Sequence, residues 1–373
     1  MPPAFVPGLD LARDFYHAVV APLLGQEFPR LRYAAALLGP GSEVAGLDSE
    51  RSTDHDWGPR LQILLTGDDA AGSGESTAGS REGTATLAGR LTTVLAERLP
   101  ESFRGYPVRF PVTREADGVP RPRVEAAPLG GWLAGLLGFD PRAGATLLDW
   151  LATPWQRLAE FTGGEVFADG PGELTGARRT LAWYPADLWC YVLASQWQRI
   201  SQEEAFPGRC AEAGDEPGSR VVTARLARDL MRLCLLMHRR YPPYSKWLGT
   251  AFARLPGTAD LATALGAALA ADRYPDRERH LGAAYAAAAR QHNALGLTPP
   301  LDPRTRGYYG RPYQVIGAAR FADALRAAVG DPRLRRLPLT GTADQFTDST
   351  DANGDLRFLR ACSAARLASA GAS

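Results

Sequence analysis

Hydrophobic and polar residues follow different patterns in the two halves of the chain. In residues 1–142, short apolar runs alternate with segments whose apolar residues recur every three or four positions. The runs predict strands at 33–38, 54–65, 106–112 and 122–127. The helical periodicity predicts helices at 9–24, 42–47, 86–99 and 131–137. Strands interleaved with helices are typical of an α/β (α+β) domain with a small mixed sheet.

Long helical patterns dominate after residue 142. They cover residues 146–162, 184–204, 219–240, 245–254 and 258–293. Apart from a hairpin expected near 165–174, no strand pair is predicted here, so residues 143–330 are expected to form an all-α domain. From residue 331 to 373, frequent Pro, Gly, Thr and Asp predict a partly irregular C-terminal extension. A chain of 373 residues is too long for one ordinary core, which agrees with two domains.

Composition narrows the class of protein. A hydrophobic content of 45% and a charged content of 22% are typical of a soluble globular protein. The sequence has no apolar run that could span a bilayer and no signal-peptide pattern at its N-terminus, so we expect a cytoplasmic protein without a membrane partner. The four cysteines have neither the paired spacing nor the histidine partners of a zinc site, and we expect reduced thiols.

The net charge of +1 provides no overall field that would attract DNA or RNA, so a nucleic-acid partner is not expected. The 42 basic residues are 41 arginines and one lysine, Lys246. A lysine ammonium is a compact point charge that can reach a phosphate without the planar geometry of arginine. Nothing in the pattern predicts the oligomeric state.

The candidate chemistry lies in residues 33–65. The first apolar run ends in a turn that contains Gly41 and Ser42, and Asp54 and Asp56 open the next predicted strand. On a regular strand these two carboxylates share a face, roughly 6–7 Å apart, while His55 faces the core. Two such carboxylates can hold a hard divalent cation. The N–H groups of the turn, and of a helix beginning there, can hold phosphate oxygens. The combination predicts phosphoryl or nucleotidyl transfer.

The Gly-Ser turn followed by Asp-x-Asp resembles the signature of the DNA polymerase beta-type nucleotidyltransferase superfamily, which includes the aminoglycoside nucleotidyltransferases. The longer strings Leu-Gly-Pro-Gly-Ser-Glu and Ser-Thr-Asp-His-Asp-Trp-Gly-Pro-Arg are similar to one branch. That branch consists of uncharacterised bacterial nucleotidyltransferase-like proteins with a helical C-terminal domain, described as a domain of unknown function. The resemblance also covers residues 208–210, 214–216 and 241–249, and so spans most of the chain.

The resemblance implies a metal-dependent enzyme that moves a nucleoside monophosphate, AMP if the donor is ATP, from an NTP to a hydroxyl group. The acceptor is expected to be a small molecule bound between the two domains. Asp54, Asp56 and a third carboxylate, best placed at Glu125, would be catalytic and would bind one or two Mg²⁺ ions. Gly41 and Ser42 would hold the phosphates of the nucleotide.

The helical half would complete this site. By the same resemblance, Lys246 would face the phosphates while Tyr244 or Trp247 stacks on the base. A carboxylate of the helical domain would act as the general base, and Asp215 represents a group of candidates between which the sequence does not choose. The other candidates are Glu203, Glu204 and Glu216.

Each of these features also has a structural explanation. An Asp-x-Asp pair can be a solvated strand end, Glu125 an exposed strand residue, Ser42 a helix N-cap, and Asp215 a favourable charge at a helix start. The string around Tyr244 and Lys246 can be a plug at a domain interface. Without its third carboxylate, the fold can be a catalytically silent nucleotide-binding module with a regulatory or antitoxin-like role.

A ribonuclease in the helical half is a further alternative. Arg232 and His238 are spaced as R-x5-H, which is similar to the pattern of helical ribonucleases often paired with small nucleotidyltransferases. Six residues place the two side chains roughly 120° apart on an ideal helix, so they do not share a face. The pattern also predicts that Arg232 continues an exposed stripe with Arg225 and Asp229.

Overall fold

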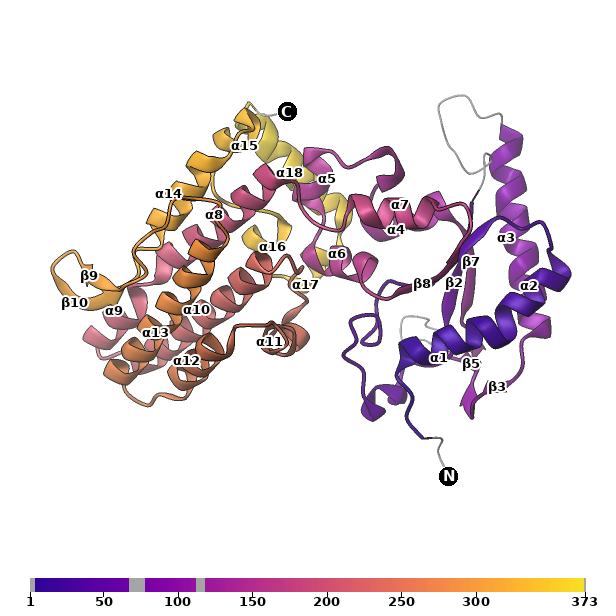
Figure 1. The fold of residues 1–373 in the computed structure, drawn as a ribbon, viewed down its shortest axis with the longest axis horizontal. Coiled ribbons are helices and arrows are strands. Elements are labelled where there is room, and N and C mark those ends of the chain that lie inside the picture. Colours follow the sequence, from indigo (N-terminus) through magenta and orange to yellow (C-terminus); the bar gives the residue numbers. More distant parts are fainter. Residues whose placement is uncertain (1–3, 67–77, 112–117, 372–373) are drawn as a thin grey trace. The chain divides into compact units, whose positions relative to one another are not determined.

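A computed structural model describes residues 4–66, 78–111 and 118–371. The chain forms two compact units (Figure 1). The first unit comprises Met1–Thr146 and Arg157–Ala182, and the second comprises Leu147–Gln156 and Trp183–Ser373. This division differs from the predicted boundary at residue 142, because residues 157–182 belong with the first unit. It also places residues 331–373 in the second unit instead of a separate extension.

The first unit is a mixed α/β structure. Its helical elements are α1 (Gly8–Phe15), the π-helix η1 (Tyr16–Val20), α2 (Ala21–Glu27), the 3₁₀-helix η2 (Glu50–Asp54), α3 (Ala78–Arg98), α4 (Leu129–Leu137), the 3₁₀-helix η4 (Pro141–Ala143), most of α6 (Trp155–Thr162) and α7 (Glu173–Thr180). Its strands are β1 (Tyr33–Leu37), β2 (Leu61–Leu65), β3 (Ser102–Phe103), β4 (Tyr106–Pro107), β5 (Arg109–Phe110), β6 (Arg121–Pro122), β7 (Val124–Pro128) and β8 (Glu165–Asp169).

A four-stranded sheet with the order β7-β2-β1-β8 forms the centre of this unit. β1 is antiparallel to both β2 and β8, whereas β2 and β7 are parallel, so the sheet is small and mixed as predicted. The hairpin expected near 165–174 is wrong. β8 pairs with β1 instead, and the chain continues into α7. Two short antiparallel pairs, β3–β4 and β5–β6, lie outside this sheet.

One face of the sheet is apolar. Leu61, Ile63 and Leu65 alternate along β2 and pack in one buried cluster with residues of α1–α2 and α3. The helix predicted at 9–24 forms and continues to Glu27, but it contains the π-helical segment η1 just before Pro22. Proline has no N–H to donate to the preceding turn, and a π-bulge is one way for a helix to absorb that loss.

The second unit is largely helical. Its helices are α5 (Leu147–Ala152), α8 (Ala186–Glu203), α9 (Phe206–Glu212), α10 (Glu216–Met237), α11 (Ser245–Ala253), α12 (Ala259–Ala270), α13 (Tyr274–Ala294), α14 (Ala319–Ala328), α15 (Pro332–Arg336), α16 (Ala343–Phe346), α17 (Thr350–Gly354) and α18 (Leu356–Ser369). The longer ones agree closely with the helical patterns of the sequence. The helix predicted at 146–162 is divided into α5 and α6 by Pro154.

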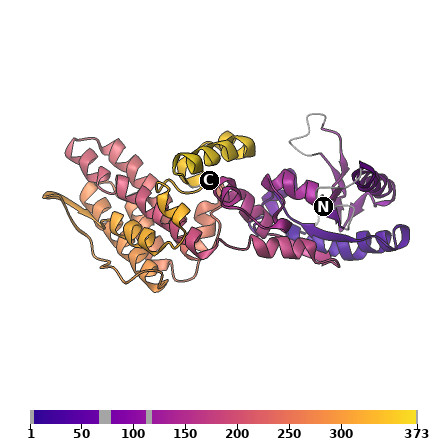
Figure 2. The same ribbon diagram turned by 90° about the horizontal axis from the view of Figure 1, so that it is seen from above.

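The prediction of an all-α second domain is wrong in one respect. β9 (Arg306–Tyr308) and β10 (Arg311–Val315) form an antiparallel hairpin that extends from the end of the helical bundle (Figure 1 and Figure 2). Within the bundle, α8 packs against α10 and α14, and α12 packs against α13. None of the helices in the described part of the chain is both long and apolar enough to cross a membrane.

Candidate functional site

Three segments of the predicted site meet at one edge of the central sheet. The turn with Gly41 and Ser42 follows the carboxyl end of β1, and the loop with Asp54 and Asp56 leads into the amino end of β2. Since β1 runs antiparallel to β2, and β2 runs parallel to β7, the carboxyl end of β1 and the amino ends of β2 and β7 share that edge. Glu125 lies near the amino end of β7 and therefore belongs to the same edge.

The prediction that Asp54 and Asp56 open a strand is wrong. Asp54 is the last residue of the 3₁₀-helix η2, Asp56 has a left-handed φ of 52°, and β2 begins only at Leu61. Gly58 has a φ of 152°, and Pro59 has no N–H for a strand ladder, so regular extended backbone does not start earlier. The two carboxylates therefore lie on a loop before the strand and not on one face of it.

His55 is exposed, so its interpretation as a core histidine is also wrong. Its Nδ1 atom lies 2.5 Å from Oδ1 of Asp54. A protonated His55 would form an ion pair with Asp54, which would compete with a metal ion for the same carboxylate. The loop thus contains two acids and one histidine that can partly neutralise them.

The helix expected at 42–47 does not form. Residues 42–46 are a series of turns, in which the Gly46 N–H donates to the carbonyl of Glu43 at 3.0 Å and the Leu47 N–H donates to that of Ser42 at 2.8 Å. Gly46 has a left-handed φ of 63°, which prevents a helix from continuing through it. Ser42 is therefore not a helix N-cap, and any phosphate contact would come from its hydroxyl group and the turn backbone.

Glu43 and Arg60 form an ion pair beside this turn, and the sequence analysis assigned neither a role. Nε of Arg60 donates to Oε1 of Glu43 at 2.7 Å, and Nη2 of Arg60 donates to the carbonyl of Pro40 at 2.6 Å. The side chains are 3% exposed for Glu43 and 17% exposed for Arg60. A Cβ atom at Gly41 would lie 2.2 Å from Nη2 of Arg60. The ion pair thus holds the turn in place, and the position of Arg60 leaves no space for a side chain at Gly41.

Gln62 is a second residue that the sequence analysis missed. It is buried within the apolar strand β2, where its side chain accepts a hydrogen bond from the Leu38 N–H at 3.0 Å and donates to the Leu38 carbonyl at 3.2 Å. These contacts fix the chain where β1 ends and the turn begins. A polar residue in the middle of the run Leu-Gln-Ile-Leu-Leu was the available signal.

Glu125 pairs in register with Gln62 on the neighbouring parallel strand, so the two side chains lie on the same face of the sheet. Although Glu125 retains exposed surface, its surroundings remove water from the carboxyl group and raise its pKa. A hydrogen bond from Trp132 and the charge of Arg60 oppose this rise. Glu125 therefore faces groups that stabilise a negative charge.

The three predicted metal ligands do not form a preassembled site. Among the residues that the structure describes, no group of three or more His, Cys, Asp or Glu side chains is gathered closely enough to hold a metal ion. Carboxylate oxygens nevertheless suit Mg²⁺, which proteins commonly bind through one or two carboxylates together with substrate phosphates. Asp54, Asp56 and Glu125 thus provide suitable ligand atoms but no preassembled cluster.

The acids proposed as a general base lie in the second unit, and each has a structural partner. Asp215 is the N-cap of α10, where its Oδ1 accepts a hydrogen bond from the Gly218 N–H at 2.9 Å. Glu203 forms a two-fold ion pair with Arg225, and Glu216 pairs with the buried guanidinium of Arg277.

Glu204 accepts hydrogen bonds from the N–H groups of Gly317 and Ala318 at 3.0 and 3.1 Å, at the start of α14. Burial raises its pKa to about 7, against the effect of these hydrogen bonds. Glu204 is only 8% exposed and connects the end of α8 to α14. The N-cap contact of Asp215 thus agrees with its explanation as a charge at a helix start, and the other three acids also have partners within the second unit.

Tyr244 and Lys246 are exposed at the start of α11. The N–H group of Tyr244 donates to Oε1 of Gln156 at 3.0 Å, which fixes the backbone of the loop before the helix. Nζ of Lys246 lies 4.8 Å from the ring centre of Trp247, within the range of a cation–π contact. Neither the Tyr244 nor the Lys246 side chain is buried within the second unit.

The expected exposed stripe on α10 is wrong. Asp229 is 2% exposed and Arg232 is 9% exposed, and both belong to a network of polar contacts inside the second unit. His238 follows α10 as its C-cap, where burial and then the charge of Arg240 lower its pKa. The buried position of Arg232 gives the ribonuclease alternative no support.

Comparison with known proteins adds one family. The family described as a domain of unknown function, DUF4037, matches residues 150–248 of the 373 residues. The matched segment contains Asp215, Tyr244 and Lys246, but it does not reach the sheet edge with its turn and its two aspartates. No curated protein matches the chain. Neither comparison connects the chain to a particular chemistry.

Proposed function

We propose that the protein is a nucleotidyltransferase of the DNA polymerase beta type, which transfers a nucleoside monophosphate from an NTP to a hydroxyl group of a small molecule. ATP is the proposed donor, so the transferred group would be AMP. The proposal begins from the resemblance of the Gly-Ser turn and the Asp-x-Asp spacing to that superfamily.

One observation carries the proposal further than the resemblance alone. The turn at Gly41, the loop with Asp54 and Asp56, and the strand with Glu125 are up to 84 positions apart in the sequence, yet they belong to one edge of a mixed sheet. A phosphate-binding turn and carboxylates at one sheet edge are what transfer of a phosphoryl-linked group requires. Asp54 and Asp56 lie at this edge although they precede β2 and are not part of it.

Each residue at the edge has a proposed task. Ser42 would donate its hydroxyl group to a terminal phosphate, and Asp54 and Asp56 would hold the Mg²⁺ that accompanies the nucleotide. When bound, such an ion neutralises phosphate charge and lowers the pKa of an attacking hydroxyl group. Arg60 holds the turn through Pro40, and its charge opposes the rise in the pKa of Glu125 that burial causes, which favours the carboxylate form that could join the metal site.

Thermal stabilisation by nucleotide tests the assignment. Purified protein should be stabilised by ATP only when Mg²⁺ is present, since the ion and the nucleotide are proposed to bind together. The variant with Asp54→Asn and Asp56→Asn should lose this stabilisation. A matched variant with Asp351→Asn and Asp355→Asn removes two charges from the second unit and should keep it. Unchanged stabilisation of the first variant would refute the metal-site assignment.

A catalytically silent nucleotide-binding module is the second candidate. It is favoured by the engagement of two proposed ligands: Asp54 contacts His55, and Glu125, whose pKa is raised, accepts a hydrogen bond from Trp132. The two candidates differ in one readout. The silent module would bind Mg²⁺ and ATP but would release no pyrophosphate with any acceptor.

A further inference from the structure

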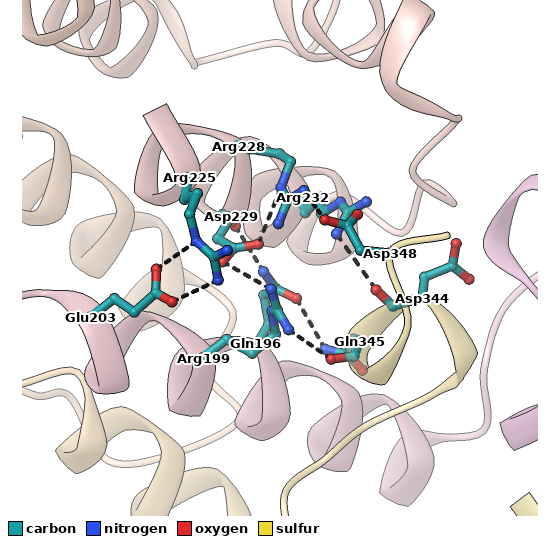
Figure 3. A network of polar contacts seen from close by, with 10 residues as sticks. All are labelled: Gln196, Arg199, Glu203, Arg225, Arg228, Asp229, Arg232, Asp344, Gln345 and Asp348. Carbon is teal, nitrogen blue, oxygen red and sulfur yellow. Dashed lines mark hydrogen bonds and ion pairs between the residues drawn. The ribbon is translucent and has the colours of Figure 1, made fainter. Parts of the chain in front are cut away.

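Three arginines of the second unit lie together in the polar network that Figure 3 shows. Arg228 and Arg232 are four residues apart on α10 and so share a face of that helix, and Arg199 reaches them from α8. We call Arg199, Arg228 and Arg232 the arginine cluster. The segment with Asp344 and Asp348, at α16 and just after it, lies against the cluster.

The donors of the arginine cluster are not fully used by the protein. The Nε atoms of all three arginines are buried and have no hydrogen-bond partner among the residues that the structure describes. Arg232 forms no ion pair with any described residue. Its Nη1 donates only to the main-chain oxygen of Asp344 at 3.5 Å, and its guanidinium lies 5.7 Å from the ring centre of Trp155. A buried arginine without an anionic partner is unfavourable.

Arg225, on the same helix, provides the contrast. Its Nε and Nη2 atoms donate to the two carboxylate oxygens of Glu203 at 3.0 and 2.6 Å, in the two-fold geometry that suits a guanidinium (Figure 3). An arginine on α10 can therefore donate two hydrogen bonds to a single carboxylate. The arginine cluster lacks such partners although it is more buried than Arg225.

Asp348 contacts the cluster from the exposed side. Its Oδ2 accepts a hydrogen bond from Nη1 of Arg228 at 2.7 Å, while its side chain remains 61% exposed. Partial burial raises the pKa of Asp348, but the hydrogen bond from Arg228 and the charges of the three arginines outweigh this effect, so the pKa is below its ordinary value. Asp348 thus marks a position where the cluster stabilises a negative charge.

Within the described part of the chain, two carboxylates face the three positive charges of the cluster. Asp229 accepts from Arg199 at 3.4 Å and lies 3.9 Å from Nε of Arg228, and Asp348 pairs with Arg228. The carboxylate of Asp344 points away from the arginines in Figure 3, and its Oδ2 accepts a hydrogen bond from the Trp155 N–H at 2.7 Å. The carboxyl group of Asp344 is enclosed, although the residue as a whole is half-buried, and burial raises its pKa to about 6. If Asp348 moves away, the three arginines face, among the described residues, only the carboxylate of Asp229.

We propose that the arginine cluster is a binding site for the phosphoryl group of a phosphomonoester, and that Asp348 occupies this site until the ligand displaces it. A tetrahedral phosphoryl group presents three oxygens, which suits three guanidinium groups from two helices better than the two coplanar oxygens of a carboxylate do. A partly exposed ion pair contributes little to stability, so a dianion can displace Asp348 at a small cost in free energy.

Titration calorimetry of the full chain with inorganic phosphate tests the site. The titration is done in EDTA, because the proposed nucleotide site of the first unit depends on a divalent metal ion. Phosphate is expected to bind, and Arg228→Gln is expected to weaken this binding about tenfold, the effect of losing one charge-assisted hydrogen bond. Asp348→Asn is expected to strengthen it, because the internal competitor is removed.

Two control variants distinguish a specific phosphate site from a general effect of the protein's charge. Arg225→Gln removes a charge from the same helix but from a paired arginine, and Asp351→Asn removes an acid outside the network. Both should change the affinity for phosphate by less than about twofold. An increase with Asp348→Asn cannot result from unfolding of that variant, so it tests the site independently of the loss expected for Arg228→Gln.

Three results would overturn the inference. The first is that neither the wild-type protein nor Asp348→Asn binds phosphate. The second is an equal loss of phosphate affinity in Arg225→Gln and Arg228→Gln, and the third is an equal affinity of the wild-type protein for acetate and phosphate. None of them depends on whether the first unit binds a nucleotide. The double variant Asp54→Asn and Asp56→Asn should retain phosphate binding, which keeps this inference separate from the proposed function.

Discussion

Arg60 and Glu43 form a nearly buried ion pair, with Nε of Arg60 2.7 Å from Oε1 of Glu43, in the turn that follows the first strand of the sheet. The same guanidinium binds the carbonyl of Pro40 and lies where a Cβ atom of residue 41 would be. The turn that we propose to hold phosphates is thus shaped by a pair of charges that do not themselves belong to the Gly-Ser pattern.

The first prediction concerns Gly41. Gly41→Ala would place a Cβ atom 2.2 Å from Nη2 of Arg60 at a φ of 151°, where side chains are rarely accommodated. We expect a loss of roughly 1–3 kcal/mol in the free energy of unfolding, measured by urea denaturation. Gly25→Ala, at an exposed helical position with nothing within 4 Å, should instead leave stability unchanged or raise it slightly. Equal effects of the two substitutions would contradict the close contact between residue 41 and Arg60.

The second prediction concerns the ion pair itself. Glu43→Ala would leave the guanidinium of Arg60 largely buried without its partner, and we expect a destabilisation of about 3 kcal/mol or more. The matched control is Glu27→Ala, which breaks the exposed pair of Glu27 with Arg98 and should lower stability by less than about 1 kcal/mol. Urea denaturation of both variants measures the difference. A mild effect of Glu43→Ala would show that the turn does not depend on this pair.

The third prediction concerns acid stability. His292 is 1% exposed, accepts a hydrogen bond from the Trp197 indole at Nδ1 and contacts the Thr298 hydroxyl group through Nε2. Burial lowers its pKa from 6.5 to about 4. Because the folded pKa lies below the unfolded one, the stabilisation is complete above pH 6.5 and is lost as the pH falls towards 4.

Unfolding free energies of the wild type and of His292→Gln should therefore differ in their pH dependence. Across the window from pH 6.5 to 4, the wild type is expected to lose about 3 kcal/mol more than the variant, in which this group does not titrate. The comparison is needed because Glu204, with a raised pKa of about 7, contributes with the opposite sign in part of the window. Parallel curves for the two proteins would rule out His292 as the titrating group.

The hydrophobic pattern predicts the fold where long periodic segments exist. The residues of α8 and α10 follow an uninterrupted helical period, and their helices form within a few residues of the predicted ends. The pattern fails where elements are short. β8 is a half-buried strand of five residues whose partner, β1, lies more than 100 positions earlier, and no local signal indicates that pairing.

The sequence predicts which segments form the candidate site but not the backbone conformation of those segments. Gly58 and Pro59 stop the extended backbone before β2, and this glycine–proline pair is the sequence signal that places Asp54 and Asp56 on a loop. The pairing of Glu43 with Arg60 could not be predicted, because no periodicity relates two charges 17 residues apart across a turn. The same holds for Arg199 in the arginine cluster, which approaches Arg228 and Arg232 only through the packing of α8 on α10.

The most direct test of the proposed activity follows the transferred group. The protein is incubated with Mg²⁺, ATP labelled at the α-phosphate and a small-molecule extract of cells, and the label and the released pyrophosphate are both quantified. The account predicts that a small molecule gains the labelled AMP group in an amount equal to the pyrophosphate, and that Asp56→Asn lowers both at least about 100-fold. ATP binding with neither labelled product nor pyrophosphate above the level of Asp56→Asn would contradict it.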